Sequence, residues 1–172
     1  MFKAYKNKII THAVEEGDLE ALGVIFNSEY IRLKNVHEDP ENYFKMAEDD
    51  VKKYVGSKKL KAIVHSHPKP PEPLRQGDAS PTPSPSAKDM KGQLATNVPW
   101  IIAAKTHTGS WDYFDWGEHL LKLPLLEQPF RHGVLDCYEY IRRRRFQKFG
   151  EVLEQFPRDN GWWYDGEDLY IQ

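Results

Sequence analysis

The sequence predicts a mixed α/β (α+β) domain followed by a short, mostly helical region. Two observations support this fold class. Short apolar runs next to turn residues, which are typical of buried strands, recur between residues 21 and 116. Segments with apolar residues at helical spacing alternate with these runs, as Ile9, Ile10 and Ala13 show near the N-terminus. With 172 residues, 40% of them hydrophobic, the chain is long enough for one domain with a small appendage.

The elements are expected in the order helix, strand, strand, helix, strand, helix, strand, strand. Apolar spacing or a favoured N-cap residue indicates the helices at residues 7–16, 47–55 and 86–96. Apolar runs indicate the strands at residues 21–26, 30–33, 59–65, 98–104 and 110–116. The first two strands form a hairpin around a turn at residues 27–29. The Pro- and Ser-rich segment at residues 69–85 is expected to be a long irregular loop, of a kind that is usually functional or mobile.

A leucine-rich linker at residues 118–130 is expected to separate the first domain, residues 1–117, from a second region, residues 131–172. Because the linker is apolar, we expect it to pack on a neighbouring element. The second region opens with a helical stretch that runs through Phe149. Four consecutive arginines at residues 142–145 put charge on more than one face of this helix, which favours a solvated helix or an intramolecular acidic partner.

The composition argues against several classes of protein. The net charge of −2 and the pI near 6.4 give no sign of a nucleic-acid binder. No apolar stretch is long enough to span a bilayer and no secretory signal opens the chain, so neither a membrane span nor classical secretion is expected. The single cysteine, Cys137, rules out an intrachain disulfide, and the chain is compatible with a reducing cytoplasm.

Two histidines at the end of a predicted strand carry the most specific chemical signal. The sequence H-S-H-P at residues 65–68 follows an apolar run. Because side chains alternate faces along a strand, His65 and His67 are expected to aim their imidazoles at one point. Asp89, in the first turn of the helix that Ser86 opens, can supply a third ligand, and catalytic zinc typically has three protein ligands and one open position. The same donors also accept other divalent ions.

A zinc hydrolase also needs a proton carrier and a donor to the oxyanion. Bound zinc lowers the pKa of its water to about 7, and a carboxylate must then carry the proton to the leaving group. Glu20, just before the strand at residues 21–26, is the candidate base. The hydroxyl of Ser86 is the candidate oxyanion donor. Four other histidines lack such partners and are expected to be surface or core residues: His12, His37, His107 and His119.

Glu20, the H-S-H-P motif at residues 65–68 and the S-A-K-D sequence at residues 86–89 resemble, in this order, the JAMM (MPN-plus) metallopeptidase family. The resemblance implies a curved mixed sheet flanked by helices in residues 1–117. It also implies that the two histidines and the aspartate bind zinc, that the glutamate is the general base and that the serine steadies the oxyanion.

The chain departs from the family pattern in the gap before Ser86, which is longer than usual and filled by the Pro-rich loop. Within this loop a Ser-Pro pattern repeats. A reading frame that starts at Ser84 would place Ala87 where the aspartate belongs, so we assign the motif serine to Ser86. Asp78, in the same loop, is the alternative ligand to Asp89 and lacks a serine at the matching spacing.

The second region contains a candidate nucleophile. Asp136 and Cys137, followed by Tyr138, resemble the nucleophile segment of the NlpC-type cysteine peptidases. A cysteine at a helix N-terminus lies at the positive end of the dipole, which lowers its pKa and favours the thiolate. A papain-like site also needs a downstream histidine, and none follows His132, so residues 131–172 are interpreted as the incomplete N-terminal part of such a domain. The alternative is that Cys137 is a buried small hydrophobic residue.

A JAMM-like domain followed directly by an NlpC-like region resembles the tail tip assembly proteins of lambda-like siphophages. Further similarities lie at residues 131–133 and 162–170. This resemblance implies a role in tail tip assembly and the cutting of peptide bonds, either in a tail protein or in the cell-wall peptide. It also implies other phage tail proteins as partners, and the host cytoplasm during assembly or the virion tail tip as the location.

Three functions are therefore compatible with the sequence. The leading hypothesis is a zinc-dependent peptidase that hydrolyses a peptide or isopeptide bond in a peptide or protein substrate. The alternative is a non-catalytic tail assembly scaffold, in which zinc is structural or absent. The third is a cysteine peptidase that uses Cys137 with a base from outside this chain.

Overall fold

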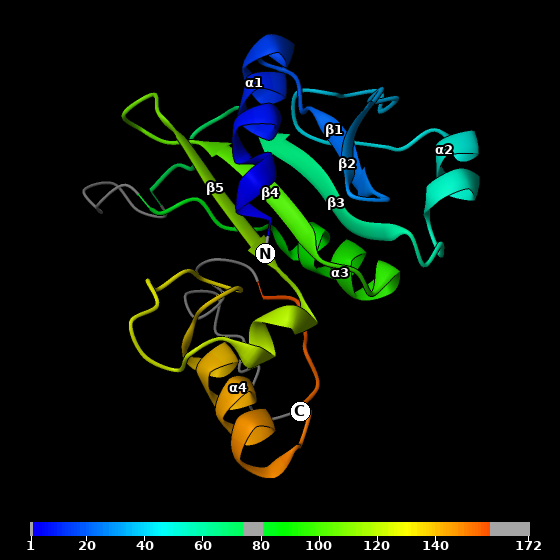
Figure 1. The fold of residues 1–172 in the computed structure, drawn as a ribbon. Coiled ribbons are helices and arrows are strands. Elements are labelled where there is room, and N and C mark those ends of the chain that lie inside the picture. Colours follow the sequence, from blue (N-terminus) through cyan, green and yellow to red (C-terminus); the bar gives the residue numbers. More distant parts are fainter. Residues whose placement is uncertain (1, 74–80, 159–172) are drawn as a thin grey trace.

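The computed structural model describes residues 2–73 and 81–158 and has a five-stranded sheet at its centre (Figure 1). The strands are β1 (Leu22–Phe26), β2 (Glu29–Leu33), β3 (Leu60–His67), β4 (Trp100–Lys105) and β5 (Trp111–Trp116). They lie side by side in the order β2-β1-β3-β4-β5. The pair β3 and β4 is parallel, and the other neighbouring pairs of this sheet are antiparallel. The predicted mixed α/β class is therefore confirmed.

Helices flank the sheet and connect its strands. They are the 3-10 helices η1 (Lys3–Tyr5) and η2 (Glu118–Lys122) and the α-helices α1 (Lys6–Glu16), α2 (Glu48–Tyr54), α3 (Ala87–Thr96) and α4 (Cys137–Phe149). The elements expected in the first region are all present, with ends within two residues of the prediction. The strand β3 is longer than predicted because it continues through His67, which pairs with Ala104 of β4. Within the described residues, no helix combines the length and the apolar character needed to cross a membrane.

The hairpin between β1 and β2 turns more tightly than predicted. Asn27 and Ser28 have φ angles of 51° and 67°, and Phe26 pairs directly with Glu29. Two-residue hairpin turns of type I′ need positive φ at both central residues, and asparagine tolerates this conformation better than most residues do. The turn therefore has two residues, where the sequence predicted three, and Glu29 belongs to β2.

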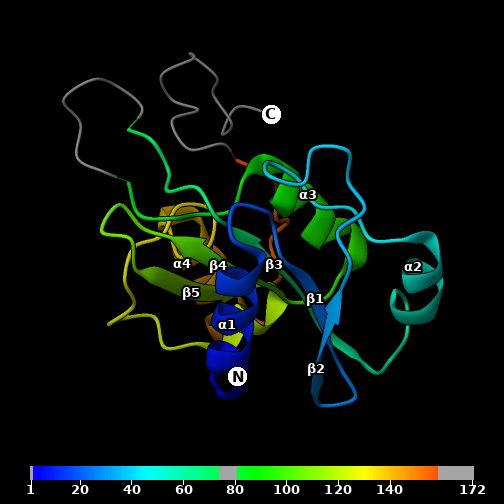
Figure 2. The ribbon, with the colours of Figure 1, turned by 90° about the horizontal axis from the view of Figure 1, so that it is seen from above.

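Side chains alternate between the two faces of the sheet, and each face has its own hydrophobic cluster. Along β4, Trp100 and Ile102 belong to the cluster on one face, whereas Ile101 and Ala103 belong to the cluster on the other. Helix α1 covers the second face, and Gly92 of α3 lies against the Trp100 ring on the first. Figure 2 shows α1 and α3 on opposite sides of the sheet. Because both faces of the three inner strands β1, β3 and β4 are buried, these strands appear in the sequence as nearly continuous apolar runs.

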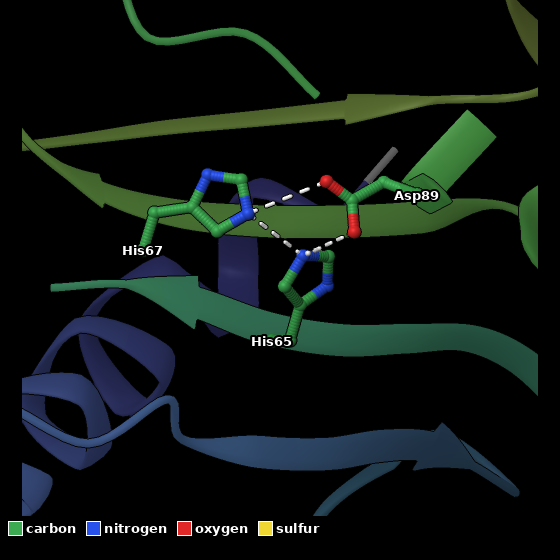
Figure 3. A group of neighbouring side chains, drawn as sticks. All are labelled: His65, His67 and Asp89. Carbon is green, nitrogen blue, oxygen red and sulfur yellow. Dashed lines mark hydrogen bonds and ion pairs between the residues drawn. The ribbon is translucent and has the colours of Figure 1, made fainter. Parts of the chain in front are cut away.

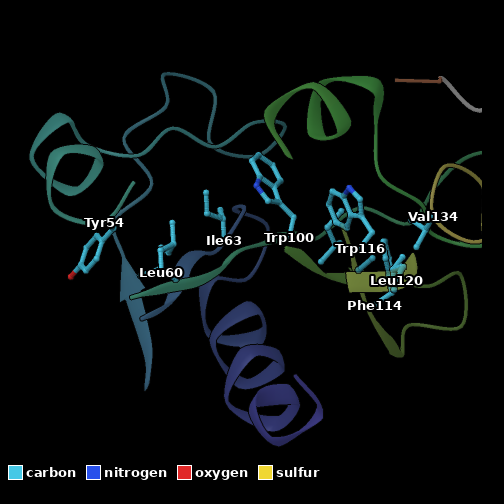
Figure 4. Packing of buried hydrophobic residues seen from close by; sticks show 11 residues of the cluster. Tyr54, Leu60, Ile63, Trp100, Phe114, Trp116, Leu120 and Val134 are labelled. Atoms are coloured by element: carbon cyan, nitrogen blue, oxygen red, sulfur yellow. The ribbon is translucent and has the colours of Figure 1, made fainter. Parts of the chain in front are cut away.

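The cluster on the α3 face extends into the C-terminal part of the chain (Figure 4). Leu120 of η2 and Val134 pack with Phe114 and Trp116 of β5. The expected packing of the apolar linker on a neighbouring element is therefore confirmed. The division of the chain at residues 118–130 stays a prediction.

Two of the four consecutive arginines of α4 are buried, so the predicted solvated helix is wrong for them. Arg142 and Arg143 are each 2% exposed. The Arg142 guanidinium donates to Glu139 at 2.9 Å and to Glu118 of η2 at 2.8 Å, which confirms an intramolecular acidic partner for this residue. Arg143 donates to the carbonyl of Leu123 at 3.0 Å. These bonds attach α4 to the linker.

We predict that Arg142→Ala destabilises the fold by about 3–5 kcal/mol, because it leaves the buried Glu139 carboxylate without its cationic partner. Arg144 is exposed and is the matched control; Arg144→Ala should change the free energy of unfolding by less than about 0.5 kcal/mol. Urea unfolding of both variants measures the difference. Equal effects of the two substitutions would show that the Arg142 network does not stabilise the fold.

Candidate metal centre

His65 and His67 lie two residues apart on β3 and point from the same face of the sheet (Figure 3). Their Nε2 atoms are 3.1 Å apart. This is the face that carries α3, because Trp100, which packs against α3, has its ring 5.6 Å from the ring of His65. The two imidazoles therefore converge, as predicted. The histidines lie within β3 and not after its end.

Asp89 reaches the histidines from the first turn of α3. Ser86 is the N-cap of this helix, and its hydroxyl accepts from the Asp89 N–H at 3.1 Å. In return, Asp89 Oδ2 accepts from the backbone N–H and from the hydroxyl of Ser86, both at 2.8 Å. This capping box places Asp89 Oδ1 3.2 Å from His65 Nε2 and Oδ2 3.4 Å from His67 Nε2.

The serine that contacts the aspartate is thus Ser86, as the chosen motif frame predicts. Ser84 lies in the wall of the adjoining cavity. Asp78, the alternative ligand, lies outside the described residues.

The donor atoms lie close enough together to share one metal ion, and each imidazole faces a different oxygen of Asp89. The two imidazole nitrogens are 3.1 Å apart, and they lie 3.2 and 3.4 Å from the nearer oxygens of the Asp89 carboxylate. Ligands about 2.0–2.1 Å from a tetrahedral zinc ion lie about 3.3–3.4 Å from one another. Imidazole and carboxylate donors are also those of catalytic zinc sites, which keep one position open. His65, His67 and Asp89 therefore fit zinc.

Burial and mutual contact set the charges of these ligands. Burial lowers the pKa of His65, whose ring centroid lies 4.5 Å from that of Phe44, and this outweighs the opposite effect of Asp89. Burial also opposes ionisation of Asp89, but the two imidazoles outweigh it and hold its pKa well below the usual range. For His67, contact with Asp89 outweighs burial and raises the pKa. A neutral imidazole and an ionised carboxylate are the forms that bind a metal, so protonation of His67 competes with metal binding.

Packing orients the ring of His65. Its Nδ1 has no hydrogen-bond partner among the described residues, whereas the second ring nitrogen of a metal-bound histidine usually donates to one. The ring instead packs against Phe44 and Trp100, whose own rings are in contact with each other. Neither aromatic residue was predicted from the sequence to belong to the site. The strand register, in which Trp100 pairs with Ile63 and Ile102 with His65, would have revealed Trp100.

Glu20 lies in the segment between α1 and β1 and lines the same cavity as His67 and Asp89. The cavity measures about 800 Å³. Glu20 is 7% exposed, and burial raises its pKa to about 7, while the proximity of His67 acts in the opposite direction. A carboxyl group that titrates near neutral pH can both accept and release a proton, which general acid–base catalysis requires. The structure therefore brings the predicted base to the predicted ligands.

The remaining cavity wall comes from two loops and from the start of α3. The loop before α2 contributes Tyr43, and the Pro-rich loop contributes Pro83. Lys88 of α3 lies over the Tyr43 ring, with its ammonium 4.1 Å from the ring centroid. Lys69 and Lys91 also line the cavity. The walls thus combine aromatic and cationic groups around the acidic centre.

Cys137 is the first residue of α4 and is exposed, so it is not the buried hydrophobic residue that the alternative interpretation required. Asp136 caps the helix by accepting from the Glu139 N–H at 2.9 Å. Within residues 2–73 and 81–158, no hydrogen bond or ion pair joins Cys137 to a base. The similar segment at residues 162–170 lies outside the described residues.

Known proteins were compared with the chain. No protein-family model matches it. The tail tip assembly protein K of Escherichia phage N15 is 30% identical over 161 residues, which make up 90% of this chain and 59% of that protein. The tail tip assembly protein K of Escherichia phage lambda is 29% identical over 110 residues, which make up 64% of this chain and 45% of that protein. The chain thus spans about half the length of these relatives.

We predict that the purified protein binds about one zinc ion per chain and that His67→Ala abolishes this binding, because two remaining ligands do not hold zinc tightly. His107→Ala is the control, since His107 is exposed and far from the ligands in the sequence. Plasma mass spectrometry after dialysis measures the stoichiometry. Equal zinc content in wild type and His67→Ala would contradict the assignment of the site.

Proposed function

We propose that this chain is a zinc-dependent peptidase that hydrolyses a peptide or isopeptide bond in connection with a phage tail tip. The single observation that carries the proposal is the cluster of three zinc-type donors, two of which, His67 and Asp89, line one cavity with the buried Glu20 carboxyl. The motif resemblance to the JAMM family, and the NlpC-like segment after it, support the same interpretation. Both relatives are named for tail tip assembly, which supports the biological setting.

Each residue of the site has a separate role in this proposal. His65, His67 and Asp89 hold the metal, and Phe44 and Trp100 keep the His65 side of the site free of water. When bound, zinc supplies Lewis acidity, which polarises a carbonyl and lowers the pKa of water. Glu20 accepts a proton at its carboxylate and passes it to the nitrogen of the leaving amine. A pKa near neutral lets one carboxyl group both accept the proton and release it.

The contacts of Ser86 favour a role different from the predicted one. Its hydroxyl hydrogen is donated to Asp89 Oδ2 at 2.8 Å, and a hydroxyl has only one hydrogen to donate. Donation to an oxyanion would require this bond to break. We therefore propose that Ser86 orients the ligand Asp89, as hydrogen-bond partners of metal ligands commonly do.

The setting of the reaction follows from the relatives. Proteins named for tail tip assembly are expected to contact other tail proteins, so we propose these as partners. The substrate is then a bond in a tail protein, cut in the host cytoplasm during assembly, or a bond in the cell-wall peptide, cut by the virion tail tip. We propose that the cavity lined by Tyr43, Pro83 and Lys88 accommodates an extended peptide in either case.

A non-catalytic assembly protein is the second candidate, because the names of both relatives describe assembly. In that case a metal would hold β3 against α3 and Glu20 would have no role in turnover. A cysteine peptidase is the third candidate, and exposure of Cys137 at the start of α4 is compatible with it. Loss of activity with iodoacetamide, and not with a zinc chelator, would favour that candidate.

We predict that Glu20→Gln keeps zinc but lowers turnover by about 10²–10⁴-fold, because it removes the proton carrier and no ligand. The probes are two quenched-fluorescent libraries, one of linear decapeptides and one joined through a lysine side chain. Cleavage by zinc-loaded wild type, Glu20→Gln and His67→Ala is followed by fluorescence. Turnover of the Glu20 variant at the wild-type rate would contradict the role of Glu20, and a zinc-loaded wild type that cleaves neither library would favour the assembly protein.

A further inference from the structure

Ser66 lies between the two histidines but faces away from them. It is 1% exposed and shares its side of β3 with Val64, on the face that α1 covers. A hydroxyl buried among apolar side chains needs a hydrogen-bond partner. The proposed chemistry gives Ser66 no role, so its partner is informative.

The partner of Ser66 is the residue next to the proposed base. The Ser66 N–H donates to the carbonyl of Ala21 at 3.1 Å, and the Ala21 N–H donates to Ser66 Oγ at 2.8 Å. In a regular antiparallel ladder, two paired residues exchange both hydrogen bonds through their backbones. Here the hydroxyl replaces the backbone carbonyl as the second acceptor. The chain therefore leaves the ladder at Ala21 without an unpaired N–H, and β1 begins at Leu22.

This departure determines where Glu20 lies. Beyond Ala21 the chain turns away from the sheet, and the Glu20 N–H donates to the carbonyl of Pro40 at 2.7 Å. The Glu20 carbonyl accepts from the side chain of Asn35 at 3.1 Å. The backbone of Glu20 is thus held on the loop side by these two bonds and on the sheet side through Ser66.

We propose that Ser66 is a positioning residue, whose hydroxyl holds the Glu20 carboxyl beside the metal ligands by accepting the Ala21 N–H. The inference rests on the proposed function in one respect, which is that Glu20 is the proton carrier. The three residues of the H-S-H sequence then have two roles on opposite faces of β3. The histidines bind metal on one face, and the serine aligns the base from the other.

Removing the hydroxyl leaves the buried Ala21 N–H without an acceptor. We expect the segment to shift toward the backbone carbonyl of Ser66 to recover a bond, which moves Glu20. A displacement of about 1 Å at a reacting group can lower turnover about 100-fold. The metal ligands are not part of this contact, so zinc binding should be unchanged.

The test compares Ser66→Thr with Ser66→Val, which have the same shape and differ in the hydroxyl. Crystal structures of the zinc-loaded wild type and of both variants locate the Glu20 carboxyl relative to the metal, whether or not the protein cleaves a probe. We expect the carboxyl to move by about 1 Å or more in Ser66→Val and to stay in place in Ser66→Thr, with about one zinc in each. An unmoved carboxyl in Ser66→Val, or the same movement in both variants, would overturn the proposal.

A kinetic cycle on the fluorescent libraries separates this inference from the proposed function. Ser66→Val should lower kcat about 10–100-fold and Ser66→Thr should restore it, whereas Ser66→Val added to Glu20→Gln should lower kcat no further. If adding Ser66→Val to Glu20→Gln lowers kcat by the same factor as Ser66→Val alone, Ser66 does not act through Glu20. If Glu20→Gln alone keeps wild-type turnover, the proposed function fails instead.

Discussion

The site depends on β3 being the central strand of the sheet. With β1 on one side and β4 on the other, its backbone is held by two ladders, and a shift by one residue would turn every side chain to the opposite face. This constraint keeps His65 and His67 on the α3 face, where the cap of α3 delivers Asp89. It also keeps Ser66 on the other face, next to Ala21. One strand thus organises the ligands and, by our proposal, the base.

Local patterns predicted much of this arrangement. Alternation along a strand was enough to bring His65 and His67 together, and a serine followed three residues later by an aspartate was enough to predict the start of α3. The inner strands were recognisable as apolar runs because they are buried on both faces, and the helices by apolar residues at helical spacing. The placement of Glu20 beside the ligands came from the family resemblance, since its spacing alone specifies no contact.

What the sequence left open depends on contacts between distant segments. The aromatic packing on His65 joins a loop residue, Phe44, to a residue of β4, Trp100, and no local pattern links them. Burial of Arg142 was missed because its neighbour on α4, Glu139, is buried with it, and because its second acidic partner, Glu118, lies in the linker. A run of arginines normally predicts solvation, and only a nearby buried carboxylate reverses that expectation.

The central claim is that the three ligands form an open zinc site beside Glu20, and X-ray absorption spectroscopy at the zinc edge tests it most directly. The account predicts two imidazole nitrogens and one carboxylate oxygen from the protein, with a fourth position that changes when acetohydroxamate is added. Four protein ligands that do not respond to acetohydroxamate would identify a closed structural site. A spectrum without the two imidazoles would contradict the assignment of His65 and His67.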